Sequence, residues 1–204
     1  MIKITKQDET KNTNKEIRKR RNMLFKNIPI TNANRLINHG PTVLITSRLG
    51  EKINVMTVAW QMPVSFKPML VAIAIGHERF SHKLILESQE FAINIPRLEM
   101  LKDVLCCGTQ SGKDIDKFKV CNLTPVKAQK IKAPLIEECI GNIECKLYST
   151  HEAGDHTIFV GEVVATSVKE VIFDNYLKVN LDEAKTLHHL GGKVFCSPGG
   201  IIKS

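Results

Sequence analysis

The sequence lacks the short motifs that mark the most common nucleotide-binding and hydrolytic enzymes. It contains no Gly-x-Gly-x-x-Gly segment for a dinucleotide-binding βαβ unit, and no phosphate loop that ends in Gly-Lys-Ser/Thr. It also contains no Gly-x-Ser-x-Gly nucleophile elbow and no His-Glu-x-x-His metal-binding helix. No apolar run approaches the roughly 20 residues that a transmembrane helix needs. These absences argue against each of those enzyme classes and against a membrane-spanning protein.

Cysteine motifs are missing as well. The six cysteines, at positions 106, 107, 121, 139, 145 and 196, form neither a Cys-x-x-Cys redox motif nor a zinc-binding spacing. His188 and His189 have no third ligand in view, so we expect no metal. The first nine residues contain no apolar segment of the kind a secretory signal requires, which makes a cytoplasmic location the expectation. Cytoplasmic thiols stay reduced, so we expect free cysteines, and for Cys106 and Cys107 ordinary packing is favoured over a redox role.

Positive charge is concentrated at the N-terminus. The formal net charge is +8, and residues 1–26, with nine basic and three acidic side chains, account for +6 of it. The run Arg18-Lys19-Arg20-Arg21 could contact a nucleic acid or another anionic surface. It contains no aromatic residue to stack on bases, so a solvated arm is favoured and nucleic acid is not an expected partner. We predict a basic, flexible extension over residues 1–26 and a single domain over 27–204.

Runs rich in β-branched and aromatic residues predict a chain made mostly of strands. The predicted strands are Thr42–Ser47, Ile53–Ala59, Leu70–Ile75, Phe91–Ile95, Ile143–Tyr148 and Ile158–Ser167. The predicted helices are Ser81–Ser88, Leu98–Cys107 and one near Leu181–Leu190. Met62–Ser65 is predicted as a turn, and His151–His156 as a generous hairpin loop. Many strands with short helices between them favour a mainly β fold, a closed or split barrel, over a doubly wound sheet.

The stretch from Asn54 to Pro96 carries polar side chains in an order that indicates a site for a phosphorylated aromatic cofactor. Arg79, Ser81, His82 and Lys83 place donors and positive charge at a predicted helix start, where unpaired backbone N–H groups attract phosphate. Further candidates precede and follow this helix start. Thr57, Ser65 and Asn94 could hydrogen-bond to the edge of a ring, and Trp60 could cover part of its apolar body.

The order of five segments resembles the flavin reductase-like family of FMN-binding split barrels, which includes the flavoredoxins. The segments are Asn54–Trp60, Arg79–Ser81, Glu90–Pro96, Cys107–Phe118 and Gly154–Val163, and the resemblance covers roughly residues 40–196. It implies a split β-barrel that binds FMN, with the phosphate held around Arg79 and Ser81, and a homodimer with the cofactor near the subunit junction. The implied cofactor-binding candidates are Asn54, Thr57, Ala59, Trp60, Ser65, Arg79, Ser81, His82, Lys83 and Asn94.

Most of these candidates also have a structural alternative. Thr57 could satisfy a strand backbone, Asn54 could be a turn residue, and Arg79 could be a surface cation. Successive helical residues point in different directions, which leaves His82 and Lys83 open. Asn94 lies among apolar strand residues, where an unpaired amide is costly, so its partner is either the cofactor or nearby backbone.

His156, in the segment Gly154-Asp155-His156-Thr157, is the candidate for substrate contact. The Asp155 carboxylate could fix its tautomer, and a donor at this position could orient nicotinamide or stabilise negative charge on the reduced flavin. The alternative is a hairpin histidine bonded to backbone. Asp116-Lys117-Phe118 matches a family motif whose role is open between a structural one and a subunit contact.

Three functions are compatible with this resemblance. The favoured one is an FMN-dependent oxidoreductase that passes electrons from NADH or NADPH through the flavin to an acceptor. Without a dinucleotide-binding domain, the nicotinamide would bind transiently against the flavin. The alternatives are a flavoredoxin-type electron carrier that serves a partner redox protein, and a non-redox split-barrel module that binds another ligand.

Overall fold

The computed structural model describes residues 26–202, and the basic run at positions 18–21 lies outside them. The chain divides into two units, Met1–Leu36 and Ile37–Ser204. The described part of the first unit contains one 3₁₀ helix, η1 (Ile30–Leu36), in which no residue is buried. The division into a flexible extension and a single domain at residue 26 stays a prediction. All further elements belong to the second unit.

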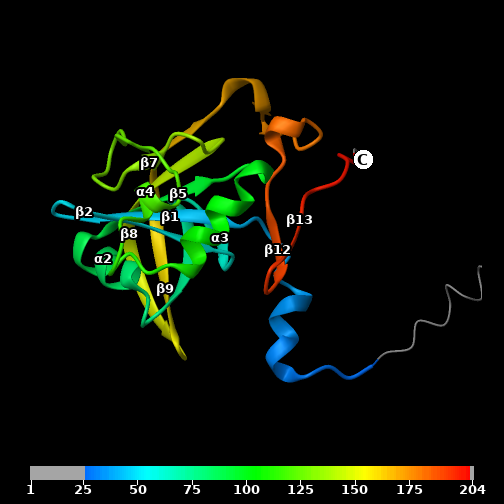
Figure 1. Ribbon diagram of the computed structural model, residues 1–204, viewed down its shortest axis with the longest axis horizontal. Coiled ribbons are helices and arrows are strands. Elements are labelled where there is room, and N and C mark those ends of the chain that lie inside the picture. Colours follow the sequence, from blue (N-terminus) through cyan, green and yellow to red (C-terminus); the bar gives the residue numbers. More distant parts are fainter. Residues whose placement is uncertain (1–25, 203–204) are drawn as a thin grey trace, which may run out of the picture. The chain divides into compact units, whose positions relative to one another are not determined.

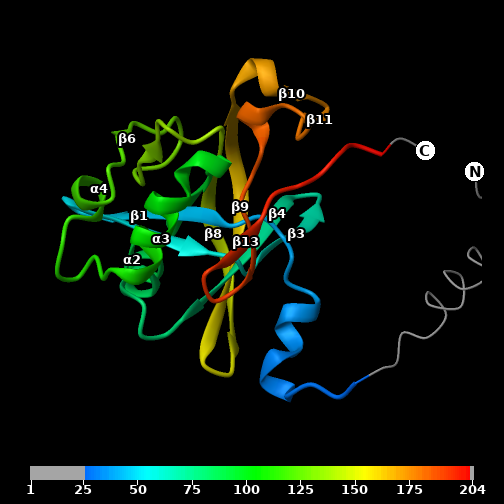
Figure 2. The ribbon, with the colours of Figure 1, turned by 45° about the vertical axis from the view of Figure 1, so that its right-hand side comes forward.

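The second unit is built on one seven-stranded antiparallel sheet. Its strands are β1 (Val43–Leu49), β2 (Lys52–Val58), β3 (Gln61–Phe66), β4 (Met69–Gly76), β5 (Glu90–Ile95), β8 (Gly141–Ala153) and β9 (His156–Val168). They are hydrogen-bonded in the order β2-β1-β5-β8-β9-β4-β3. In Figures 1 and 2, β1 crosses the long β8–β9 hairpin at a steep angle, as expected of a strongly curled sheet. The mainly β prediction is confirmed.

The connection between β2 and β3 shows why this sheet curls into a barrel. β2 and β3 are the two edges of the sheet, yet only Ala59 and Trp60 separate them in the chain. Three Cα–Cα steps span at most about 11 Å, so the two edges must lie close together at this point. The Ala74 N–H donates to the Trp60 carbonyl at 3.0 Å, which ties the connection to β4. No β2–β4 ladder is formed among the described residues, and the barrel is therefore split between these strands.

Short helices and small strand pairs complete the unit. The helices are α2 (Phe80–Ser88), η2 (Leu98–Met100), α3 (Leu101–Thr109), α4 (Lys117–Val120), η3 (Glu170–Ile172) and η4 (Asp182–Ala184). The paired strands are β6 (Pro125–Val126) with β7 (Leu135–Ile136), β10 (Phe173–Asp174) with β11 (Tyr176–Leu177), and β12 (His188–Gly191) with β13 (Val194–Cys196). No helix in residues 26–202 is long and apolar enough to cross a membrane.

Both faces of β1 are buried, and each face belongs to a different core. Val43 and Ile45 lie in the core cluster that also contains Phe91 and Phe159, from β5 and β9. Leu44 points to the opposite face, as strand periodicity requires. It lies in a second cluster that includes residues of α3 and α4. The second cluster therefore fixes α3 and α4 against the outer face of β1 and β2.

Two predicted elements are wrong. The segment near Leu181–Leu190 is not a helix: η4 covers only three residues, and β12 begins at His188. The Leu187 carbonyl accepts from the Thr42 N–H, so this segment is extended in order to bond with backbone elsewhere in the chain. The predicted turn at Met62–Ser65 lies inside β3, which accommodates Pro63 at the edge of the sheet, next to a bulge.

The predicted generous loop of the β8–β9 hairpin is also wrong. Ala153 pairs directly with His156, which leaves a two-residue turn of Gly154 and Asp155. Gly154 has a φ of 68°, the positive value that such tight turns need and that glycine adopts without strain. As a result, Asp155 and His156 sit at the rigid tip of a hairpin.

The expectation that every cysteine is a free thiol is wrong for one pair. Cys106 on α3 and Cys121, directly after α4, form a disulfide with a Cα–Cα distance of 5.6 Å, which is in the usual range for such bonds. The two residues are 15 positions apart, and the packing of α3 against α4 brings them together. Sequence spacing alone does not reveal that contact.

Candidate functional site

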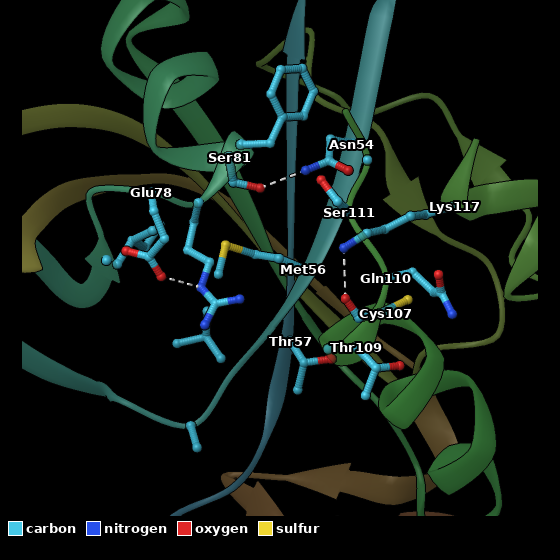
Figure 3. A pocket seen from close by; sticks show the side chains of 18 of the residues that line it. Asn54, Met56, Thr57, Glu78, Ser81, Cys107, Thr109, Gln110, Ser111 and Lys117 are labelled. Carbon is cyan, nitrogen blue, oxygen red and sulfur yellow. Dashed lines mark hydrogen bonds and ion pairs between the residues drawn. The ribbon is translucent and has the colours of Figure 1, made fainter. Parts of the chain in front are cut away.

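A cavity of about 400 Å³ opens where the barrel is split, and we call it the site pocket. Such a volume lies within the usual range for small-molecule sites. Its lining comes from β2, the Ala59–Trp60 connection, the end of β4, the start of α2, the α3–α4 region and the tip of the β8–β9 hairpin. The lining residues are Asn54, Met56–Trp60, Ala74–Gly76, Glu78–Ser81, Cys107–Gly112, Lys117 and His156. Figure 3 shows ten of them labelled.

One end of the site pocket is formed by the start of α2. Arg79 is the N-cap residue, and no side chain caps the helix. The His82 N–H donates to the Arg79 carbonyl at 2.9 Å, which leaves the N–H groups of Phe80 and Ser81 for a ligand. Ser81 is only 1% exposed, and its hydroxyl oxygen accepts from the Asn54 amide at 2.8 Å (Figure 3). The hydroxyl hydrogen of Ser81 is left to donate. The Arg79 Nε contacts the Glu78 carboxylate at 2.8 Å, and its terminal nitrogens can bind a further anion.

A buried cation lies in the wall opposite α2. Lys117 is 5% exposed, and its Nζ donates to the carbonyls of Val55 at 2.9 Å and Cys107 at 2.6 Å. These two bonds tie the start of α4 to β2 and to the end of α3, and Figure 3 shows the one to Cys107. Burial lowers the pKa of Lys117 from its ordinary value and raises the pKa of the Cys107 thiol to about 12. An ammonium group has three N–H donors, so one remains for a pocket ligand.

Between α3 and α4, the chain passes very close to β2. A Cβ added to Gly112 would lie 1.9 Å from the Asn54 Oδ1, so only glycine fits at this approach. That oxygen is buried and has no hydrogen-bond partner within the described residues. Thr57 reinforces the same contact, because its hydroxyl donates to the Val104 carbonyl at 2.6 Å.

The opposite end of the site pocket carries aromatic side chains. The rings of Trp60 and His156 lie 4.9 Å apart between centroids, tilted by 34°. The indole of Trp60 is 43% exposed, which leaves an apolar surface at the pocket mouth. The His156 Nδ1 lies 2.7 Å from the Asp155 carboxylate. That hydrogen bond holds the pKa of Asp155 below its usual value, and it assigns the His156 proton to Nδ1.

The structure brings most of the sequence candidates together in this pocket. Asn54, Thr57, Ala59, Trp60, Arg79, Ser81 and His156 all line it. Residues that are spread over about 100 positions of the sequence therefore line one cavity. The Thr57 hydroxyl donates its hydrogen to the Val104 carbonyl, so toward a pocket ligand its oxygen can only accept a hydrogen bond.

Four candidates do not line the pocket. Ser65 lies on β3, where its hydroxyl accepts from the Lys67 N–H at 3.3 Å. His82 turns to the inner side of α2, where Nε2 lies 2.8 Å from the Thr157 hydroxyl and the ring packs on Phe159. Burial, followed by the charge of nearby His77, lowers the pKa of His82.

Lys83 and Asn94 are also placed elsewhere. Lys83 is on the exposed side of α2, 3.7 Å from Glu87. Asn94 is fully buried and makes the backbone contacts that were the alternative to cofactor binding. Its amide donates to the Leu44 carbonyl at 3.0 Å, and its oxygen accepts from the Ile136 N–H at 3.0 Å. It therefore joins β1, β5 and β7.

Sequence reasoning missed the contribution of Cys107–Gly112 and Lys117 to the pocket. The motif that contains them was recognised without a role. Its last residues are structural: Asp116 caps α4 by accepting from the Phe118 N–H at 3.1 Å, and Phe118 is buried. The one signal in the sequence is that Lys117 stands between Asp116, a typical capping residue, and Phe118, a typical core residue. Its carbonyl partners, however, are known only from the fold. No cluster of three or more potential metal ligands occurs in residues 26–202.

Comparison with known proteins finds similarity to the flavin reductase-like family. A family model described as "Flavin reductase like domain" matches residues 35–187. An uncharacterised protein of Archaeoglobus fulgidus is 42% identical over 154 residues, 76% of this chain and 85% of that protein. The fold is similar to flavoredoxin from Methanosarcina acetivorans, with a TM-score of 0.78, 24% identity and coverage of 88% and 95% of the two chains. It also resembles an FMN-binding domain of flavin reductase-like enzymes from Shewanella baltica, with a TM-score of 0.75, 25% identity and coverage of 87% and 95%.

Proposed function

We propose that this chain, which belongs to the flavin reductase-like family, binds FMN in the site pocket and passes electrons from NADH or NADPH through it to an acceptor. The observation that carries the proposal is the division of the pocket into two chemically different ends. Ser81, Arg79 and the start of α2 form an anion-binding end, and Trp60 with His156 forms an aromatic end. FMN has the same division, with a phosphate at one end and a planar ring system at the other.

The pocket residues fit this group by three tests. The donors at the start of α2 are of the kind that binds phosphate: a buried hydroxyl, a guanidinium and helical N–H groups. The Asn54 amide donates to the Ser81 hydroxyl oxygen at 2.8 Å, so the hydrogen of that hydroxyl remains for a ligand oxygen. The close approach of Gly112 to Asn54 narrows the pocket between β2 and the α3–α4 segment, as a flat ligand requires.

FMN, when bound, supplies two-electron redox chemistry, and the protein supplies position and electrostatics. Ser81 and Arg79 would bind the phosphate, and Asn54 would hold Ser81 in its orientation through their 2.8 Å hydrogen bond. The remaining N–H of Lys117 would stabilise negative charge on the ligand. Trp60 would cover apolar ring surface at the mouth. With its proton on Nδ1, His156 presents Nε2 as the nitrogen that meets a donor nucleotide.

The second part of this proposal is a homodimer formed through the β3 edge. Met62, Val64 and Phe66 on this edge strand are 57%, 47% and 91% exposed. Large exposed apolar side chains on an edge strand favour association with another chain. Because β3 directly follows Trp60, a second copy would lie beside the pocket mouth. Sedimentation equilibrium should show a dimer for the wild type and a monomer for Phe66→Asp, and a monomeric wild type would contradict this part.

Anaerobic stopped-flow spectroscopy tests the reaction. FMN-loaded protein should lose its oxidised-flavin absorbance when mixed with NADH or NADPH. His156→Ala should slow this loss by roughly 100-fold, the order of effect of a small misplacement of the reacting groups, because the nitrogen that would orient the donor nucleotide is gone, while FMN stays bound. His151→Ala is the matched control, because His151 lies on the same hairpin outside the pocket lining. If both nicotinamides leave the flavin oxidised and a reduced partner protein bleaches it, the chain is an electron carrier.

A further inference from the structure

The disulfide closes a loop that contains much of the site pocket wall. It joins Cys106 on α3 to Cys121, immediately after α4. Seven lining residues, Cys107–Gly112 and Lys117, lie between these two cysteines. Within the second unit, the bond therefore encloses the whole contribution of α3, α4 and their connection to the pocket.

The connection enclosed by the disulfide makes few other long-range bonds. The Gln110 N–H donates to the Cys106 carbonyl at 3.1 Å, and the Asp114 and Ile115 N–H groups donate to the Ser111 carbonyl at 3.2 and 3.3 Å. All three bonds are local. The long-range hydrogen bonds come from Lys117 at the far end of the segment. The position of residues 110–116 relative to β2 therefore depends on the packing of Gly112 against Asn54 and on how firmly the ends of the segment are held.

The two cysteines of the disulfide differ in their exposure to solvent. Cys121 is 2% exposed, whereas Cys106 is only partly buried. An external thiolate can therefore reach Cys106 first, and Cys121 is the leaving group. Cys107 and Cys139 lie in the same core cluster. Burial raises the pKa of both thiols, to about 12 for Cys107, so they remain protonated and do not exchange with the disulfide.

We propose that the Cys106–Cys121 disulfide is a redox modification site that controls the affinity of the site pocket for FMN. The oxidised form holds the α3–α4 segment against β2 and retains the flavin. A dithiol reductant attacks the Cys106 Sγ, which breaks the S–S bond, forms a mixed disulfide and releases Cys121 as a thiol. The second thiol of the reductant then displaces Cys106, so two electrons and two protons pass to the protein and the reductant becomes a cyclic disulfide.

Reduction lowers the affinity because it frees the segment. Once the covalent tether is gone, residues 110–116 can leave the conformation that lines the pocket. The apparent dissociation constant rises in inverse proportion to the fraction of molecules that keep the binding conformation. If a tenth of the reduced molecules keep the binding conformation, the FMN dissociation constant rises about tenfold. This inference depends on FMN binding as proposed above, and it adds a control of that binding by thiols.

Two measurements on the full-length chain test the proposal. In the first, protein purified without reductant is alkylated in the native state, then reduced, alkylated with a second reagent and mapped by mass spectrometry. We expect Cys196, which is exposed, to carry the first label, and Cys106 and Cys121 to carry the second. First-label modification of Cys106 would show that the bond is absent and overturn the proposal.

In the second measurement, FMN is titrated by calorimetry with and without dithiothreitol. Wild type and Cys196→Ser should both show a rise of about tenfold in the dissociation constant on reduction. The double variant Cys106→Ser/Cys121→Ser should show the weaker affinity under both conditions. Hydrogen exchange of residues 110–116 in the FMN-free protein should quicken on reduction, a readout that needs no flavin. Equal exchange and equal FMN affinity in the two states would overturn the inference and leave the proposed function intact. Absence of FMN binding in both states would instead contradict the proposed function.

Discussion

Replacing Ser81 with aspartate places a negative charge where the account puts the phosphate of FMN. Ser81 is buried at the start of α2, beside Arg79, and its oxygen accepts from Asn54. An aspartate oxygen can accept the same Asn54 N–H, so the local structure is retained. Two unit charges about 4 Å apart repel by about 4 kcal/mol at an effective dielectric constant of about 20. That repulsion corresponds to an increase of about 1000-fold in the FMN dissociation constant.

Riboflavin lacks the phosphate of FMN, so its binding separates charge repulsion from a general disturbance of the pocket. Ser81→Asp should leave the riboflavin dissociation constant nearly unchanged, because no like charge is brought close to the new carboxylate. Calorimetric titration of both ligands into wild type and variant measures the difference directly. Ser65→Asp is the matched control, since it makes the same substitution on β3 outside the pocket. Retained riboflavin binding also shows that the variant is folded.

Two outcomes would refute the phosphate assignment. Unchanged FMN affinity in Ser81→Asp would mean that the phosphate lies elsewhere. Equal weakening for FMN and riboflavin would mean that the substitution disturbs the pocket as a whole and that no anion site exists at the start of α2.

Further substitutions test the packing of the pocket wall. In Gly112→Ala the new Cβ would overlap the Asn54 Oδ1, which should cost about 1–3 kcal/mol of FMN binding free energy. Titration should then show FMN binding weakened about 5- to 150-fold. Gly199→Ala is the control, because its Cβ meets no atom within 4 Å and FMN affinity should stay unchanged. Lys117→Met leaves two carbonyls unpaired at about 1–3 kcal/mol each, so calorimetry should show a Tm at least about 4 °C lower. Lys119→Met removes an exposed lysine and should shift Tm by less than about 2 °C; equal shifts for the two lysines would contradict the role of Lys117.

Most strands of the barrel could be predicted from the sequence because they are rich in residue types that favour strands. Strands β1, β2, β4, β5, β8 and β9 each overlap a predicted strand segment. The β3 strand was not predicted, since a Met-Pro dipeptide suggests a turn and only the edge position tolerates Pro63. The predicted helix near Leu181–Leu190 failed for a related reason. Its leucines serve contacts with distant segments, such as the bond between Leu187 and Thr42.

The candidate site shows the same limit. Residues close in sequence to the start of α2, such as Arg79 and Ser81, could be recognised because a helix start has a local signature. The wall formed by Cys107–Gly112 and Lys117 depends on the packing of α3 and α4 against β2, which no spacing rule gives. Asn94 illustrates the converse. The sequence correctly predicts that the Asn94 amide needs a hydrogen-bond partner, but only the fold shows that this partner is backbone.

A crystal structure of the chain with FMN tests the central claim most directly. We expect the phosphate within hydrogen-bond distance of the Ser81 hydroxyl and the Arg79 guanidinium, with the ring system extending toward Trp60 and His156. An FMN bound in the reverse orientation would contradict the assignment of the two ends. An empty site pocket at saturating FMN, with the flavin elsewhere or absent, would contradict the proposed function itself.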